Sequence, residues 1–159
     1  MPIPYFILAA VIVAADQAVK YLVRSNIDLG QVVSFLPGLL DLTFVKNTGA
    51  AFSSLAEHTW LLTLISALAS LAMAVILVKA PLPHWSGRLA LGLMLGGAVG
   101  NFVDRLLQGY VTDMFSTAFM NFPVFNVADI ALVVGGILLC VHVIFFMREE
   151  PGKKEETAP

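Results

Sequence analysis

Charge is scarce in this sequence. Only 13% of its 159 residues are Asp, Glu, Lys or Arg, whereas a soluble domain usually carries about a quarter. Hydrophobic residues make up 58% of the chain, and the mean hydropathy is +0.87. This balance indicates a polytopic membrane protein rather than a soluble domain. The net charge of −2 argues against a nucleic-acid partner, which would need a basic face.

Cysteine and histidine are also few. The single cysteine, Cys140, lies in an apolar run, so neither a disulfide framework nor a Cys-rich metal site can form. The histidines are scattered at His58, His84 and His142 and lack the spacing of metal ligands. No Gly-Ser-Gly elbow and no Ser/Lys pair stands out. These absences remove the commonest cysteine, histidine and serine chemistries.

Four apolar segments have the length of ~20 residues that a bilayer core requires. They cover roughly residues 4–24, 60–79, 88–107 and 127–147. The first is not a convincing signal peptide, because it lacks a basic start and carries Asp16 and Lys20. We predict one polytopic domain over residues 1–147 and a disordered, solvated tail over residues 148–159.

Basic residues predict the orientation. Lys79 and Arg88 flank the tight connection between the second and third spans, and the tail holds further basic residues. By the positive-inside rule both termini are cytoplasmic. The long connections over residues 25–59 and 108–126 then face outward, although Arg24 and Lys46 on that side weaken the bias.

The outward connections contain β-prone runs. Residues 31–36 and 39–45 flank Pro37-Gly38, a turn signal, and residues 110–115 form a third short run of aromatic and β-branched residues. We therefore predict an all-α membrane protein of four transmembrane helices with a small extramembrane β-sheet on the outer face.

The polar residues of the spans converge at one depth. With a rise of ~1.5 Å per residue, Asp16 lies ~18 Å along the first span and Asn101 ~20 Å along the third. Asn126 and Asp129 fall in the first turn of the fourth span, which starts outside. Charged groups in apolar surroundings are costly, so their gathering near the outer leaflet indicates a functional site there.

Helical spacing supports this convergence. Gly97, Asn101 and Asp104 share one face of the third span. Small residues at every fourth position let another helix approach that span closely; they are Gly92, Gly96 and Gly100.

Structural interpretations compete with functional ones. Asn126 can cap the fourth span while Asp129 suits its positive end. Asp16 and Lys20 can form an intrahelical ion pair, or Lys20 can reach outward to the interface. Asp113 is the hardest to explain structurally, because Asp is disfavoured in a β-prone run.

Three chemistries remain open from the residues alone. Two carboxylates sharing a proton can activate water and protonate a leaving group. Asp104, Asp113 and Asp129 can instead hold a hard cation for phosphoryl transfer. Asp16 can also carry protons in a small transporter. Spacing does not choose between Asp104 and Asp113 as a reacting group.

Five motifs in this order resemble the successive sequence boxes of bacterial lipoprotein signal peptidase, also called signal peptidase II. They are Asp16-Gln-Ala-Val-Lys20, Asn47-Thr-Gly-Ala-Ala-Phe52, Gly96-Gly-Ala-Val-Gly-Asn-Phe-Val-Asp-Arg105, Val111-Thr-Asp113 and Phe125-Asn-Val-Ala-Asp129. The resemblance extends from about residue 10 to residue 147, and the third and fifth boxes together are highly specific. One departure is Met114, where the family usually has Phe.

The resemblance implies an aspartic endopeptidase of the bacterial cytoplasmic membrane that needs no metal and no cofactor. It would remove the signal peptide of a prolipoprotein, cutting just before a cysteine that carries diacylglycerol. The implied partners are that lipidated precursor and membrane lipid. Cyclic lipopeptide inhibitors would occupy the same cleft, and we expect a monomer.

The resemblance also assigns residues. The catalytic pair would be Asp113 and Asp129. Supporting or substrate-binding positions would be Asp16, Lys20, Asn47, Gly49, Gly97, Asn101, Asp104, Arg105 and Asn126. The individual roles of the supporting Asn and Arg side chains stay open.

Overall fold

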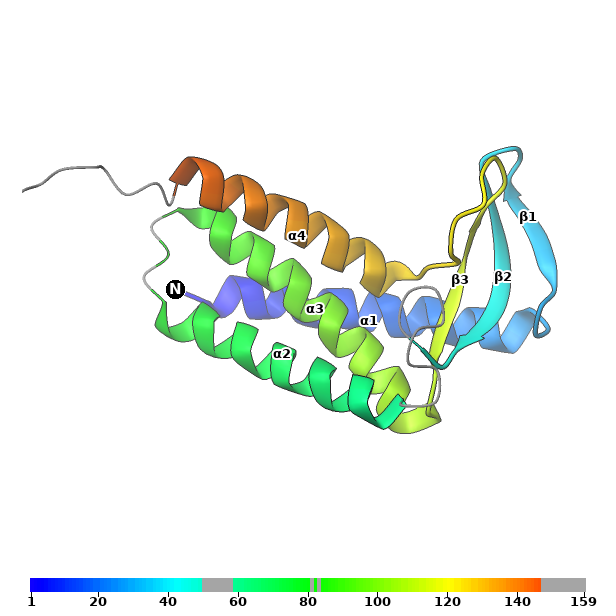
Figure 1. Cartoon of the computed structure of the whole chain (residues 1–159), viewed down its shortest axis with the longest axis horizontal. Coiled ribbons are helices and arrows are strands. Elements are labelled where there is room, and N and C mark those ends of the chain that lie inside the picture. Colours follow the sequence, from blue (N-terminus) through cyan, green and yellow to red (C-terminus); the bar gives the residue numbers. More distant parts are fainter. Residues whose placement is uncertain (50–58, 81, 83, 147–159) are drawn as a thin grey trace, which may run out of the picture.

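Four long helices and three strands make up the part of the chain that the structure describes, residues 1–49, 59–80, 82 and 84–146. The structure is a computed structural model. Its helices are α1 (Ile3–Asn26), α2 (Thr59–Lys79), α3 (Trp85–Gln108) and α4 (Val127–Phe146), and its strands are β1 (Val32–Leu36), β2 (Leu40–Asn47) and β3 (Val111–Thr117). The helices run side by side, and the sheet lies across one end of the bundle with its strands directed across the helix axes (Figure 1).

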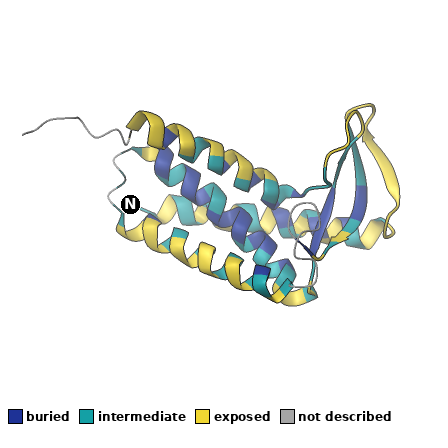
Figure 2. Cartoon of the chain, viewed as in Figure 1, coloured by how far each residue is buried: buried dark blue, intermediate teal, exposed yellow. Residues whose placement is uncertain are grey.

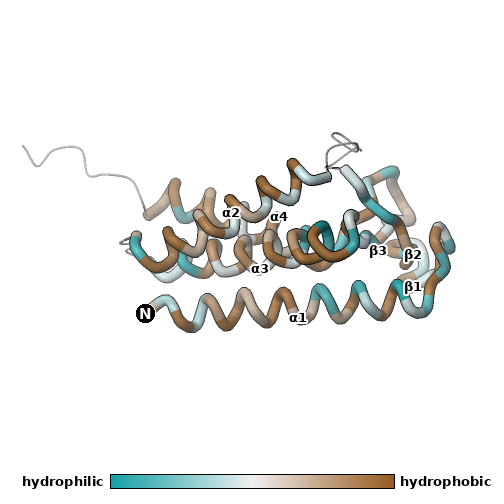
Figure 3. Tube along the Cα trace, turned by 90° about the horizontal axis from the view of Figure 1, so that it is seen from below, coloured by the Kyte–Doolittle hydropathy of each residue, from teal (hydrophilic) through white to brown (hydrophobic). Residues whose placement is uncertain are grey.

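All four helices are long and apolar enough to cross a membrane. This confirms the predicted spans to within a few residues and makes the chain a multi-pass membrane protein. The hydrophilic residues of α1 lie in its half toward the sheet (Figure 3). The N-terminus and the end of α4 lie at the opposite end of the bundle (Figure 1). The predicted disordered tail over residues 148–159 lies outside the described residues.

Helix α3 occupies the centre of the bundle and packs against each of the other three helices. Its buried residues are continuous along its length, whereas α2 and α4 expose most of their outer faces (Figure 2). Exposed Leu, Val and Ile side chains on those faces suit contact with lipid. The central position of α3 follows from its small residues, which let neighbouring backbones approach.

The predicted ridge of small residues faces α1. A methyl group added at Gly92 would lie 3.1 Å from the Tyr5 carbonyl oxygen, and one at Gly96 would lie 2.8 Å from Ile12 Cβ. One at Gly100 would lie 2.7 Å from Asp16 Oδ2. The ridge therefore holds α1 against α3, and its end toward the sheet makes room for a carboxylate.

The sheet has the order β1-β2-β3, with both pairs antiparallel. Gly38 adopts φ +76° in the turn between β1 and β2, a conformation that favours glycine. The three predicted runs are confirmed, but β2 extends to Asn47 and β3 to Thr117. Val45 pairs with Asp113, so β2 and β3 carry Asp113 to the bundle.

Met114, the departure from the family pattern, points away from Asp113 because neighbouring strand residues alternate in direction. It is fully buried and packs with Val23 and Phe44. The substitution therefore changes the contact between the sheet and α1 rather than the lining of the site.

A first prediction concerns Gly97, where an added methyl group would collide with the Ala128 carbonyl oxygen of α4. Gly97→Ala should lower stability by about 1–3 kcal/mol, the usual cost of overpacking. Gly136→Ala is the matched control, because no heavy atom lies within 4 Å of its added methyl group; it should be neutral or stabilising. Thermal unfolding in detergent measures both. Equal melting temperatures would contradict the close approach of α3 and α4.

Candidate active site

The ammonium group of Lys20 lies at the centre of a buried polar network. Lys20 has no exposed surface, and its Nζ lies 2.8 Å from Asp16 Oδ2 and 3.3 Å from Asp104 Oδ2. It also donates to Asn101 Oδ1 at 2.9 Å. These three acceptors match the three N–H donors of an ammonium group. The alternative that Lys20 reaches outward to the interface is therefore wrong, because its partners lie inside the bundle.

The two carboxylates beside Lys20 join four elements. Asp16 Oδ1 accepts the backbone N–H of Ala128 at 2.9 Å, so an α1 carboxylate lies at the positive N-terminus of α4. Asp104 Oδ2 accepts the backbone N–H of Thr112 at 2.8 Å, which ties α3 to β3. Gln17 donates to Asp104 Oδ1 at 3.1 Å. This cluster fixes α1, α3, α4 and the sheet relative to one another.

Two further carboxylates, Asp113 and Asp129, are connected through Asn126. Asn126 Nδ2 donates to Asp113 Oδ1 at 2.6 Å, and Asn126 Oδ1 accepts the backbone N–H of Asp129 at 2.9 Å. Asp129 Oδ2 in turn accepts the backbone N–H of Asn126 at 3.1 Å. This reciprocal pattern is a capping box at the start of α4. The capping interpretation is thus correct, and the same Asn also holds Asp113.

Each of these carboxylates has a second amide donor. Asn101 Nδ2 donates to Asp129 Oδ1 at 2.8 Å, and Asn47 Nδ2 donates to Asp113 Oδ2 at 2.8 Å. Asn47 Oδ1 accepts the backbone N–H of Gly49 at 3.0 Å, which closes an Asx turn after β2. The turn thereby directs the Asn47 amide toward Asp113.

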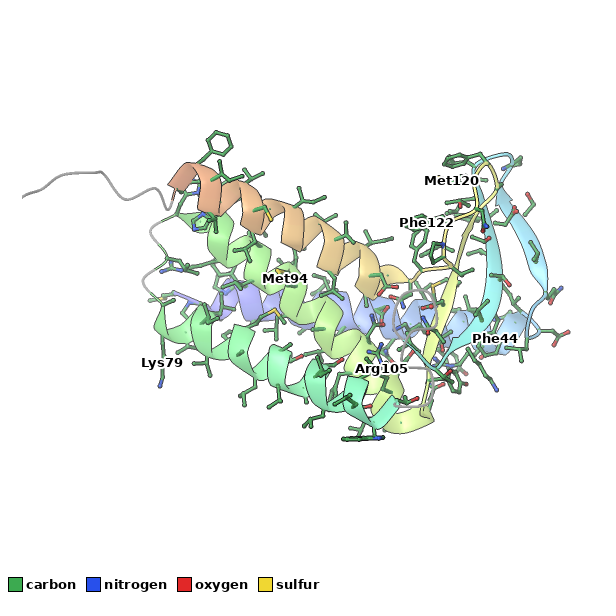
Figure 4. All side chains as sticks on the ribbon, viewed as in Figure 1. Phe44, Lys79, Met94, Arg105, Met120 and Phe122 are labelled. Atoms are coloured by element: carbon green, nitrogen blue, oxygen red, sulfur yellow. The ribbon has the colours of Figure 1, made fainter. Side chains whose placement is uncertain are left out.

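A pocket of about 760 Å³ opens over these two carboxylates. Its lining combines residues of β2, β3, α3, α4 and the segment before α4. Arg105 lines it from α3 and donates to Ser66 Oγ of α2 at 3.3 Å. Arg105 lies at the sheet end of α3, far from Lys79 at the other end of the bundle (Figure 4). Among the described residues the buried Nε of Arg105 has no hydrogen-bond partner.

Asp113 is almost completely buried. Burial raises the pKa of its carboxyl group to about 6, and the nearby Asp129 carboxylate also raises it, while the amides of Asn47 and Asn126 oppose the shift. A carboxyl group with such a pKa can hold or release a proton near neutral pH, as general acid catalysis requires.

Comparison with known proteins agrees with this geometry. The family model described as signal peptidase (SPase) II matches residues 8–145. The lipoprotein signal peptidase of Enterococcus faecalis is 41% identical over 150 residues, which cover 94% of this chain and 92% of that relative. That of Lactiplantibacillus plantarum is 42% identical over 140 residues, covering 88% and 93%. The chain belongs to the signal peptidase II family.

A solved bacterial membrane enzyme has the same fold, with a TM-score of 0.83 and 29% identity over 98% of this chain and 94% of that structure. The protein is accordingly a membrane-embedded aspartic peptidase that cleaves signal peptides from prolipoproteins. The comparisons give no support to the phosphotransferase or the transporter considered above.

The pocket separates the predicted signal peptidase II residues into two sets. One set lines it: Asn47, Gly49, Asn101, Arg105, Asp113, Asn126 and Asp129. The other set, Asp16, Lys20, Gly97 and Asp104, does not line it and packs among the helices instead. Among the described residues, no three Asp, Glu, His or Cys side chains are placed to hold a metal ion.

Sequence reasoning missed two members of the network, Gln17 and Arg24. Gln17 bridges Asp104 and the Gly100 carbonyl oxygen, and Arg24 donates to Thr112 Oγ1 at 2.9 Å. Arg24 also lies 3.8 Å from Asp104 Oδ1. Arg24 stands four residues after Lys20, and this i, i+4 spacing was the signal that could have placed it in the network. Gln17 stands inside the first motif.

A second prediction concerns Lys20. Lys20→Met keeps the length of the side chain but leaves Asp16 and Asp104 without their shared cation. Breaking a buried pair in this way typically costs about 3–5 kcal/mol. We expect a large fall in melting temperature and loss of peptidase activity. Lys79→Met, at an exposed position of α2, is the control and should behave as wild type. Wild-type stability of Lys20→Met would show that the network does not hold the helices together.

Proposed function

We propose that Asp113 and Asp129 form the catalytic dyad of this peptidase and hydrolyse the scissile amide with a water held between them. The observation that carries this proposal is the position of the Asn126 side chain. Its Nδ2 donates to the Asp113 carboxylate, and its Oδ1 accepts the backbone N–H of Asp129. The two carboxyl groups come from the sheet and from α4, and both line the same pocket. Asp104 is excluded from this role because it is fully buried and does not line the pocket.

The two carboxyl groups take different roles. Asp113, whose pKa is raised to about 6, holds the proton and acts as the acid. Asp129 lies in the first turn of α4 and accepts two N–H donors, which stabilise a negative charge; it acts as the base. Asp129 takes a proton from the water as the water oxygen attacks the carbonyl carbon. The C–N bond then breaks, and Asp113 gives its proton to the departing amine.

The remaining pocket residues position these groups. Asn101, Asn126 and Asn47 orient the carboxylates, since each donates an amide N–H to one of them. Arg105 lines the same pocket, and within the described part of the chain its buried Nε–H has no acceptor. A backbone carbonyl of the substrate is its natural acceptor. Arg105 therefore binds the substrate backbone in this scheme.

The dyad lies at the end of the bundle that carries the sheet, and we place this end at the outer leaflet of the bacterial cytoplasmic membrane. Both termini are then cytoplasmic. The basic residues Lys79 and Arg88 at the opposite end support this orientation. The substrate is the diacylglyceryl-modified precursor, whose lipid anchor holds the bond before its cysteine at the depth of the dyad. Cyclic lipopeptides that carry an acyl chain should inhibit at this pocket.

The dyad gives a third prediction. Asp113→Asn and Asp129→Asn should each lower kcat by ~10²–10⁴, the usual contribution of a general acid or base. Both variants should stay folded, because Asn keeps the shape of the side chain. The double variant should be barely slower than either single one, since the pair acts as a unit. Asp28→Asn, at an exposed position, is the control. Near-normal cleavage by either dyad variant would refute the assignment.

A fourth prediction follows from the pKa of Asp113. The acid must be protonated, so kcat/KM should fall as the pH rises through about 6. Asn47 donates to Asp113 Oδ2 and favours its ionised form, so Asn47→Ala should raise the pKa of Asp113 and move this fall to higher pH. Asn26→Ala, at an exposed site on α1, should leave the profile unchanged. A rise of kcat/KM as the pH increases through about 6 would reverse the proposed roles, because Asp113 would then have to be ionised to act.

A fifth prediction tests the orientation. In a Cys140→Ser background, Ser34→Cys on β1 should react with a membrane-impermeant maleimide in intact cells. Lys79→Cys should react only after the membrane is permeabilised. Both positions are exposed and lie at opposite ends of the bundle. Labelling of Lys79→Cys in intact cells would instead place the pocket at the cytoplasmic side of the membrane.

A further inference from the structure

Helix α1 contributes none of the residues that line the dyad pocket, yet one of its faces reaches both elements that carry the dyad. Asp16, Lys20 and Arg24 follow one another at intervals of four residues and therefore share this face. They form hydrogen bonds to α4, α3 and β3, respectively. Helix α4 carries Asp129, and β3 carries Asp113. Arg24 is thus the residue of this face that acts on the strand of Asp113.

Arg24 holds the residue directly before Asp113. Its NH1 group donates to Thr112 Oγ1 at 2.9 Å, and Thr112 has no exposed surface. The backbone N–H of Thr112 donates to Asp104 Oδ2 at 2.8 Å. Because successive side chains of a strand point to opposite faces, Thr112 points away from the pocket into which Asp113 projects. Two helices, α1 and α3, therefore hold this point of β3 from behind the pocket.

The bond from Arg24 supplies a constraint that the other contacts of β3 with the helices do not. The sheet end of α1 lies behind β3 (Figure 1), and beside Thr112 the contact is apolar, between Met114 and Val23. Apolar contact is not directional, so it holds the sheet on α1 without fixing where β3 lies along the helix. The Asp104 bond alone would let the strand pivot about it. A second directional bond, to the side chain of the same residue, stops that movement.

The contact of Arg24 with Thr112 outweighs its contact with Asp104. Arg24 NH1 lies 3.8 Å from Asp104 Oδ1, and the Arg24 side chain is 22% exposed. A long, partly exposed ion pair of this kind adds little to stability, and Asp104 has Lys20 as its nearer cation at 3.3 Å. The 2.9 Å bond to Thr112 is charge-assisted and shorter. Arg24 therefore acts mainly on the position of Thr112.

We propose that Arg24 is a positioning residue for the general acid of the reaction: through Thr112 it fixes the point of β3 from which Asp113 reaches the scissile bond. The inference rests on the proposed dyad and on the role of Asp113 as its acid. A general acid must lie within hydrogen-bond reach of the departing nitrogen, and a misplacement of about 1 Å can cost ~10² in rate. Loss of the Arg24 bond slows the step in which Asp113 gives up its proton.

A change of leaving group tests this inference. The full-length enzyme is given two lipid-modified precursor peptides that differ only at the scissile bond, which is an amide in one and an ester in the other. A departing amine needs a proton from the acid, whereas a departing alcohol depends on it less. The ratio of kcat for the ester to kcat for the amide therefore reports how well Asp113 delivers its proton. Both values come from one sample, so the ratio does not depend on how much of a variant is folded.

Arg24→Met removes the donor and Thr112→Val removes the acceptor, so each should raise the ester-to-amide ratio about tenfold. The double variant should show about the same ratio as either single variant, because both act through one hydrogen bond. Thr112→Ser keeps the hydroxyl group and should keep the wild-type ratio. Ser25→Met, at the exposed position next to Arg24, introduces the same side chain as Arg24→Met and is the matched control; it should also keep the wild-type ratio.

A wild-type ratio in either Arg24→Met or Thr112→Val would overturn the inference. So would a ratio in Thr112→Ser as high as in Thr112→Val, or a double variant in which the two single effects multiply to about a hundredfold. Asp113→Asn distinguishes these results from a failure of the proposed function, since its ratio should rise by ~10² or more. A wild-type ratio in Asp113→Asn would remove Asp113 as the acid. A raised ratio in Asp113→Asn alone would refute only the role of Arg24.

Discussion

The buried ammonium group of Lys20 is the interaction on which the arrangement of the site depends. It donates to Asn101 Oδ1, so the Nδ2 of that amide must point the other way, toward Asp129. Asn126 also donates to Asn101 Oδ1, which fixes its amide in turn and leaves its Oδ1 to cap α4. One cation behind the pocket thus sets the direction of two amides. Through them it directs N–H donors to both Asp113 and Asp129.

The free-energy cost of burying these charged groups explains how the helices pack around them. A cation and two carboxylates without exposed surface are stable only if every donor and acceptor has a partner. The glycines of α3 let α1 and α4 approach closely enough to provide those partners, since side chains at Gly97 and Gly100 would fill the space. The backbone N–H groups of Ala128 and Thr112 complete the set. Close helix packing and the polar network are therefore parts of one constraint.

Much of the fold could be predicted from the sequence because its signals are local. Long apolar runs predicted the helices, and Pro37-Gly38 predicted the hairpin turn. The spacing of Gly92, Gly96 and Gly100 predicted that a second helix approaches closely. The depth of Asp16 and Asn101 correctly indicated that they meet at one level.

The division between reacting and supporting carboxylates could not be read from spacing. Asp104 and Asp113 are equally polar in the sequence, and only tertiary contacts place one behind the pocket and the other in it. The partners of Lys20 were likewise hidden, since an i, i+4 pair with Asp16 is also compatible with a lysine that reaches the interface. Arg24, an exception to the charge bias, is explained by its contacts with Asp104 and Thr112.

The central claim is that burial beside Asp129 raises the pKa of Asp113 to about 6, so that Asp113 holds the proton of the pair. Infrared difference spectroscopy of the substrate-free enzyme across a pH titration observes that proton directly. A carboxylic acid carbonyl band should titrate at about pH 6, disappear in Asp113→Asn and persist in Asp28→Asn. A band that remains in Asp113→Asn, or the absence of any carboxyl titration near pH 6, would contradict the account.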